Sequence, residues 1–166
     1  MKNEKFASGV VFTAATLGLL VASLGAERFA KRRSQKLLIV AGFVVTIVGI
    51  VVLIALVEES TSVWAFVPGL LLTGFGLGAM LTPSVNVVQS AFPEALQGEI
   101  SGLSRSVSNL GSSLGTAIAG TILISVVTHG NRAYGWAMAS LAVFGLVGLA
   151  AALALPGKVE RRSPAA

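Results

Sequence analysis

The sequence contains no cysteine and no aspartate, and only 11% of its 166 residues are charged. Without cysteine, the chain can form no disulfide and offers no thiolate ligand or nucleophile. Soluble domains are about 25% charged, whereas this chain is 54% apolar and cannot cover a globular surface with charge. We therefore expect a lipid bilayer, rather than water, around most of it.

Residues that build active sites are equally scarce. The seven acidic residues are all glutamates, and none lies within a long apolar stretch. His129 is the one histidine, so no second histidine, cysteine or aspartate completes a metal site with it. The glycine-rich "GFGLGAM" has no strand before it, and there is neither a phosphate loop nor a nucleophile elbow. We predict that the protein is not an enzyme and holds no metal and no cofactor.

Five apolar stretches are long enough to cross a membrane. Each has 19 to 23 residues without Asp, Glu, Lys or Arg, and about 20 apolar residues in a helix cross a hydrocarbon core ~30 Å thick. Their residues do not alternate with a period of two, as strands of a membrane barrel would. We predict an all-α membrane protein with five transmembrane helices in one domain, residues 1–166. The predicted spans are residues 8–26, 37–57, 63–83, 106–127 and 133–155.

Basic residues gather in "GAERFAKRRSQK", residues 25–36, which holds five of the twelve. Loops rich in Lys and Arg stay cytoplasmic, and placing this loop inside puts nine basic residues inside and three outside. We predict a multi-pass protein of the plasma membrane with its N-terminus outside and a cytoplasmic tail, residues 156–166. The weakly positive "MKNEK" before the first span argues against a cleaved signal peptide. Bases placed at the ends of apolar stretches indicate lipid, and not nucleic acid, as the partner.

The fourth span carries two stripes of polar or small residues. On a helix of 3.6 residues per turn, Asn109, Ser112 and Thr116 share a polar stripe that begins at Arg105. Gly111 and Gly115 belong to a neighbouring stripe of small residues, together with Ser104, Ser108 and Ala119. The polar stripe is costly against lipid, so it faces either a water-filled path or a partner helix. The small stripe lets another helix backbone approach closely.

The third span is also rich in glycine. Gly74 and Gly78 share one face with Thr82, which favours close packing against another helix. Pro68 and Pro83 lie at its two ends, where proline costs little. The residues after Pro83 either continue the helix into the cytoplasm or lie along the membrane interface.

Residues 68–125 resemble the C-terminal half of a major facilitator superfamily transporter, most closely the fourteen-span drug:proton antiporter branch. The resemblance lies in a glycine-rich span ending in Thr-Pro, a loop with Pro-Glu and Gly, and a following span with small residues. The matching residues are Thr82-Pro83, Pro93-Glu94, Gly98, Ser101-Gly102-Leu103, Asn109-Leu110-Gly111 and Leu114-Gly115-Thr116-Ala117. It implies part of a C-terminal six-helix bundle.

The basic loop is similar to a cytoplasmic loop motif of the same family. "ERFAKRRSQK" matches that motif at Ala30, Arg32 and Lys36. It departs at Lys31, which stands where the family has an aspartate that helps to latch the cytoplasmic gate. The basic part of the motif is retained, and its acidic part is lost.

The resemblance implies a fragment or split half of a membrane transporter. In the intact protein we expect export of small amphipathic molecules by proton antiport, with Asn109, Ser112 and Thr116 as candidate path-lining residues. The missing N-terminal half, or a second copy of the chain, is the expected protein partner. The alternative is a small multi-span interaction module with no transport activity of its own, assembled through the Gly111 and Gly115 face.

Overall fold

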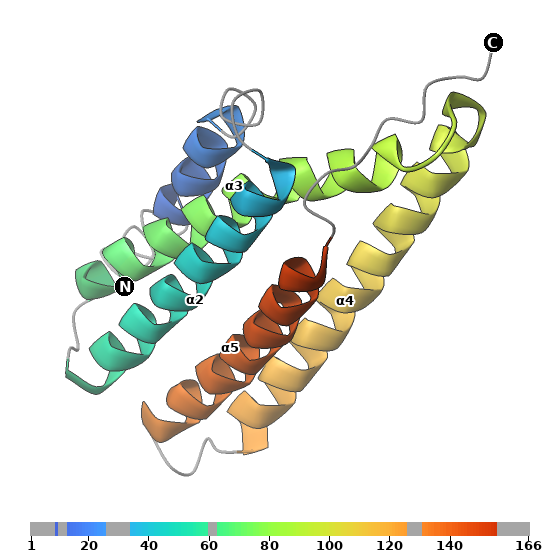
Figure 1. The fold of residues 1–166 in the computed structure, drawn as a ribbon. Coiled ribbons are helices and arrows are strands. Elements are labelled where there is room, and N and C mark those ends of the chain that lie inside the picture. Colours follow the sequence, from blue (N-terminus) through green and yellow to red (C-terminus); the bar gives the residue numbers. More distant parts are fainter. Residues whose placement is uncertain (1–8, 10–12, 26–33, 60–62, 126–130, 156–166) are drawn as a thin grey trace.

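The computed structural model describes residues 9, 13–25, 34–59, 63–125 and 131–155, and every regular element in them is helical (Figure 1). The elements are a helix over Thr13–Gly25, α2 Gln35–Glu59, the 3-10 turn η1 Val63–Phe66, α3 Val67–Ser90, the 3-10 turn η2 Glu94–Leu96, α4 Gln97–Ser125 and α5 Asn131–Ala154. The prediction of an all-α protein with five helices is confirmed.

Three of these helices are long and apolar enough to cross a bilayer: Gln35–Leu56, Trp64–Ser90 and Gly135–Ala154. The helix over Thr13–Gly25 is apolar but shorter within the described residues. Helix α4 has the length, but its serine and glycine residues lower its mean hydropathy. That the first and fourth helices also cross the membrane stays a prediction.

Helix α3 runs beyond residue 83, the predicted end of the third span. Pro83 lies inside the helix, which continues to Ser90. A proline inside a helix removes one backbone hydrogen bond and crowds the preceding turn. In that turn the Ser84 hydroxyl donates a 2.6 Å hydrogen bond to the carbonyl oxygen of Met80, and the Pro83 ring is fully buried. Of the two alternatives for this segment, the structure shows the helical continuation.

Glycines let α3 lie against the helix over Thr13–Gly25. A Cβ atom on Gly74 would collide with the carbonyl oxygen of Ala15, and one on Gly78 would lie 2.9 Å from the Cβ of Ala22. The backbones of the two helices are therefore in direct contact, as at small-residue interfaces in membranes. Figure 1 shows this first helix and α2 on either side of α3.

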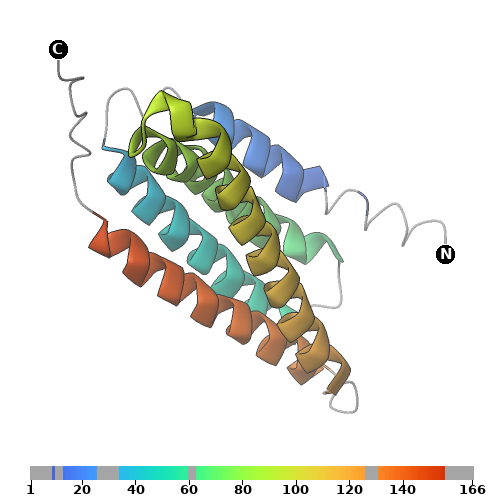
Figure 2. The same ribbon diagram turned by 90° about the vertical axis from the view of Figure 1, so that its right-hand side faces the viewer.

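Helix α2 packs against both α3 and α5, and it has its most extensive contacts with α3. Against α5, a Cβ atom on Gly148 would overlap the ring of Phe43, and one on Gly145 would lie 3.1 Å from Ile47. Residue numbers rise along α2 as they fall along α5, so the two helices are antiparallel. Figure 2 shows them side by side along most of their length.

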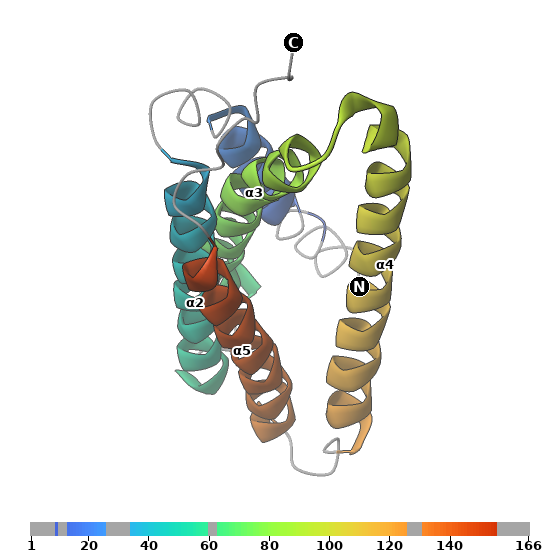
Figure 3. The same cartoon turned by 45° about the vertical axis from the view of Figure 1, so that its right-hand side comes forward.

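Helix α4 is the least covered helix. It contacts α5 and, more weakly, α3, and every residue from 105 to 114 is exposed. Figure 3 shows that the end of α4 lies nearest to the beginning of α5 and that the two helices stand further apart toward their other ends. At that other end, Gln89 Nε2 of α3 donates a 2.9 Å hydrogen bond to Ser101 Oγ of α4.

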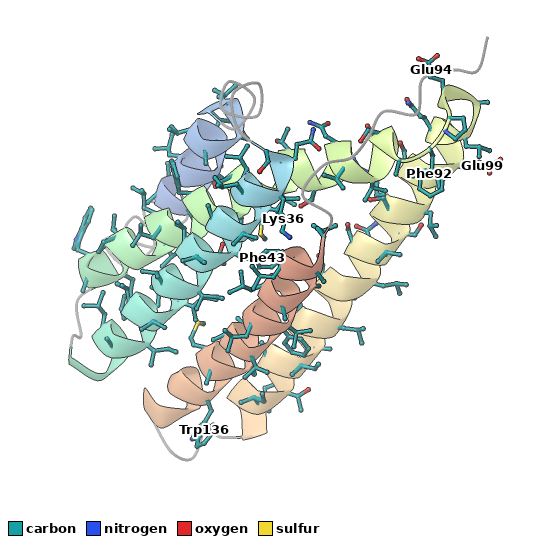
Figure 4. All side chains as sticks on the ribbon, viewed as in Figure 1. Lys36, Phe43, Phe92, Glu94, Glu99 and Trp136 are labelled. Carbon is teal, nitrogen blue, oxygen red and sulfur yellow. The ribbon has the colours of Figure 1, made fainter. Side chains whose placement is uncertain are left out.

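The two ends of the molecule differ in composition. Trp64 and Trp136, which are 57% and 65% exposed, lie where α3 and α5 begin. Lys36, Glu94 and Glu99 lie toward the opposite end, as Figure 4 shows for Trp136 and these three residues. Tryptophan concentrates at membrane–water interfaces, so the end that carries Trp64 and Trp136 is suited to one of the two interfaces.

Candidate functional site

The candidate site is the exposed length of α4. This helix follows Pro93 and η2, and Glu99 lies in its first turn, where a carboxylate stabilises the positive end of the helix dipole. Its remaining residues are mostly small, hydroxylated or aliphatic, so the chain stays helical while its faces differ in polarity. The site therefore depends on which face each residue occupies.

Asn109, Ser112 and Thr116 lie on one face of α4, and all three are exposed. The Thr116 hydroxyl donates a 2.8 Å hydrogen bond to the backbone carbonyl of Ser112, one turn earlier in the helix. That bond satisfies the hydroxyl within the helix and leaves the amide of Asn109 and the hydroxyl of Ser112 as the polar groups directed outward. The structure thus brings the three predicted path-lining residues onto one surface, and their role in a path remains a prediction.

The opposite face of α4 is apolar. Leu110 precedes Ser112 by two residues, which is about 200° around a helix, and Leu103, Val107 and Leu114 continue the same apolar stripe. These four side chains are 60–64% exposed. An exposed leucine stripe suits lipid, whereas an exposed amide and hydroxyl do not. In a bilayer, the two faces of α4 therefore call for different surroundings.

The small-residue stripe of α4 lies between these two faces. Gly115 and Ala119 are half-buried, yet a Cβ atom on Gly111 or Gly115 would meet no heavy atom within 4 Å. Within the described residues, no helix approaches these two glycines as closely as the first helix approaches Gly74 and Gly78. The packing role of Gly111 and Gly115 stays a prediction.

Of the predicted loop motif, Ala30 and Arg32 lie outside the described residues. Lys36 is described, and its ammonium group donates hydrogen bonds of 2.7 and 2.6 Å to the carbonyl oxygens of Leu153 and Leu155. Sequence analysis missed this contact, because the partners are 117 and 119 residues apart and offer only backbone atoms. No pattern of side chains in the sequence marks it.

Among the described residues, no group of three His, Cys, Asp or Glu side chains is placed to hold a metal ion. His129 lies outside these residues. What α4 offers is a row of hydrogen-bonding groups in an apolar setting. Such a row can bind and orient a solute, but it does not carry out covalent chemistry.

Comparison with known proteins gives two matches. The family model described as Major Facilitator Superfamily matches residues 3–166. The chain is also 30% identical over 115 residues to the multidrug efflux pump LfrA of Mycolicibacterium smegmatis, an alignment that covers 69% of this chain and 23% of the pump. The chain thus spans about a quarter of the length of the curated relative it matches. No solved structure matches it.

Proposed function

This chain belongs to the major facilitator superfamily, and from that premise we propose that it supplies the last five helices of the C-terminal bundle of a drug exporter. It is a multi-pass membrane protein of a transporter family, and not an enzyme. The proposed activity is export of small amphipathic molecules across the plasma membrane by proton antiport and alternating access. A second polypeptide or chain segment supplies the remaining helices.

Support for a drug exporter comes from the matched efflux pump and from the motifs in residues 68–125. The five apolar stretches contain no carboxylate, and intramembrane acids commonly relay protons in transporters. Proton coupling is therefore assigned to acidic residues of the remaining helices. The proposed substrate is amphipathic because the exposed groups of α4 combine hydrogen-bonding side chains with a flanking apolar surface.

The observation that carries this proposal is the polarity of the two α4 faces. Asn109 and Ser112 are exposed on one face and Leu110 and Leu114 on the other. Lipid can cover only the leucine face without penalty. We assign the polar face to the central path, where water and substrate satisfy its hydrogen bonds.

The proposal is tested in the intact transporter with Asn109→Leu and Ser112→Leu. Each removes one hydrogen-bonding group at a cost of about 1 kcal/mol, so we expect export to fall about fivefold for each. Leu110→Val is the matched control, because it changes the opposite face of the same turn and should leave export unchanged. Normal membrane levels with unchanged export in both leucine variants would contradict the assignment.

A second candidate function is an interaction module without transport of its own. The observation that favours it is the open space around Gly111 and Gly115, which leaves a helix-packing face available. Purified chain in energised vesicles separates the two functions. Flux that appears only after adding the remaining helices supports the exporter. Self-association without flux, weakened by Gly111→Leu, supports the module.

A further inference from the structure

The side chain of Lys36 in α2 is hydrogen-bonded to the C-terminal end of α5. Its Nζ donates to the carbonyl oxygens of Leu153 and Leu155, at 2.7 and 2.6 Å. The side chain is half-buried, and Figure 4 shows it beside the last turn of α5. One ammonium group thus joins the beginning of α2 to the end of α5.

This contact meets a need of α5. The last four carbonyl groups of a helix have no partner within it, and they form the negative end of the helix dipole. Helix α5 has no basic residue in its last turn, so its own sequence does not provide a cation there. Lys36 supplies from another helix the charge and the hydrogen bonds that α5 lacks.

The same residue is poorly placed for α2 itself. Lys36 is the second residue of α2, where the positive end of the helix dipole disfavours a cation. A lysine there weakens its own helix unless its charge is used elsewhere. The described groups that use it are the carbonyl groups of Leu153, in the last turn of α5, and of Leu155, the residue directly after α5.

The Lys36 contact is in register with the packing of the two helices. Phe43 lies seven residues after Lys36 and packs over Gly148, and Ile47 lies four residues further and packs near Gly145. We call these three contacts the α2–α5 seam. Sliding α5 by one turn, about 5.4 Å, would break the hydrogen bonds of Lys36 and place a side chain against Phe43.

We propose that Lys36 is a positioning residue that caps α5 from α2 and fixes the register of the α2–α5 seam. This role goes beyond export and beyond setting the membrane topology. A topology signal needs only a basic residue somewhere in the loop. The cap needs a cationic donor at position 36, because the Lys36 Nζ there lies within 2.7 Å of both carbonyl oxygens.

Hydrogen exchange of the full chain in lipid nanodiscs tests the proposal. In Lys36→Met, amides of residues 150–155 should exchange about tenfold faster. Losing hydrogen bonds to a charged group raises the equilibrium constant for local opening by about this factor. Lys36→Gln keeps a donor without the charge and should show most of that increase. Lys36→Arg keeps the charge and should exchange nearly as slowly as the parent.

Gln35→Met serves as the matched control, since it adds the same side chain one residue earlier. It should leave exchange in α5 unchanged. If Lys36 acted only as a surface charge, Lys36→Met would instead slow exchange at the beginning of α2 and leave α5 unaffected. That result would overturn the proposal.

The Arg and Gln variants keep the test decisive if Lys36→Met does not insert into the membrane. Slow exchange in Lys36→Arg together with fast exchange in Lys36→Gln supports the cap, provided that the difference is confined to the end of α5. Equal exchange rates in Lys36→Arg and Lys36→Gln overturn it. So does a rise in exchange rate that is spread evenly over α2, α3 and α5.

Discussion

Gly42 of α2 and Gly76 of α3 lie backbone to backbone. A Cβ atom on Gly42 would lie 2.8 Å from the carbonyl oxygen of Gly76, and one on Gly76 would lie 2.7 Å from that of Gly42. Gly49 and Gly69 repeat this arrangement seven residues away, at 3.0 and 3.3 Å. Because both helices have the same spacing and run antiparallel, the two pairs are in register and hold α2 and α3 in direct contact.

We expect Gly76→Ala to destabilise the protein by about 1–3 kcal/mol, the usual cost of overpacking a filled interior. The added methyl group would lie against the backbone of Thr46, which cannot move aside as a flexible side chain would. Unfolding in detergent, followed by tryptophan fluorescence, measures the change.

Gly111→Ala is the control for this prediction, because a Cβ atom there meets no heavy atom within 4 Å. Alanine is about 1 kcal/mol better than glycine inside a helix, so this variant should be unchanged or more stable. Equal destabilisation by both substitutions would mean that the contact at Gly76 is unimportant.

Single cysteines should distinguish the two faces of α4. The parent chain has no cysteine, so each introduced thiol is the only one in this chain, and a partner supplying the remaining helices is used in a cysteine-free form. In the intact transporter we expect a water-soluble maleimide to react with Ser112→Cys and to leave Leu114→Cys unmodified, since we assign the first to a hydrated path and the second to lipid. A labelling ratio below about ten would fail to separate water from lipid. The reverse order would place the path on the leucine face.

The hydrogen bond between Gln89 and Ser101 should couple the end of α3 to the beginning of α4. We expect Gln89→Leu and Ser101→Ala each to lower stability, and a double-mutant cycle to return a coupling of about 1 kcal/mol. Unfolding of the four proteins in one detergent gives the number. Strict additivity of the two substitutions would show that the bond contributes nothing. Ser106→Ala is a suitable unrelated control, because the hydroxyl of Ser106 is bonded within α4.

We expect the distribution of basic residues to set the membrane topology. A fluorescent reporter fused after Ala166 should fold and fluoresce in the cytoplasm, and a reporter that needs export should be inactive there. Replacing Arg28, Arg32 and Arg33 with Gln should reduce the cytoplasmic fraction, while replacing Lys2 and Lys5 should not. A C-terminus found outside would exclude the proposed arrangement of the five helices.

Much of the fold was predictable from local patterns. Long apolar runs without charges satisfy their backbone in lipid only as helices, so the helices could be located from composition alone. The two stripes of α4 were also predictable, because positions three and four residues apart share a helix face. The sequence left open whether the helix continues past the predicted span end at residue 83. The structure continues it to Ser90, with a buried Pro83 beside Ser84 inside the helix.

The sequence by itself determined which segments are helical and which residues share a face, because both depend on interactions within a few residues. Only the tertiary structure decided which faces meet. It paired Gly42 with Gly76, left Gly111 and Gly115 without a close neighbour among the described residues, and brought Lys36 to the end of α5. Glycines and backbone carbonyl groups have no side-chain chemistry from which a partner could be identified in the sequence, so their pairing depends on how whole helices fit together.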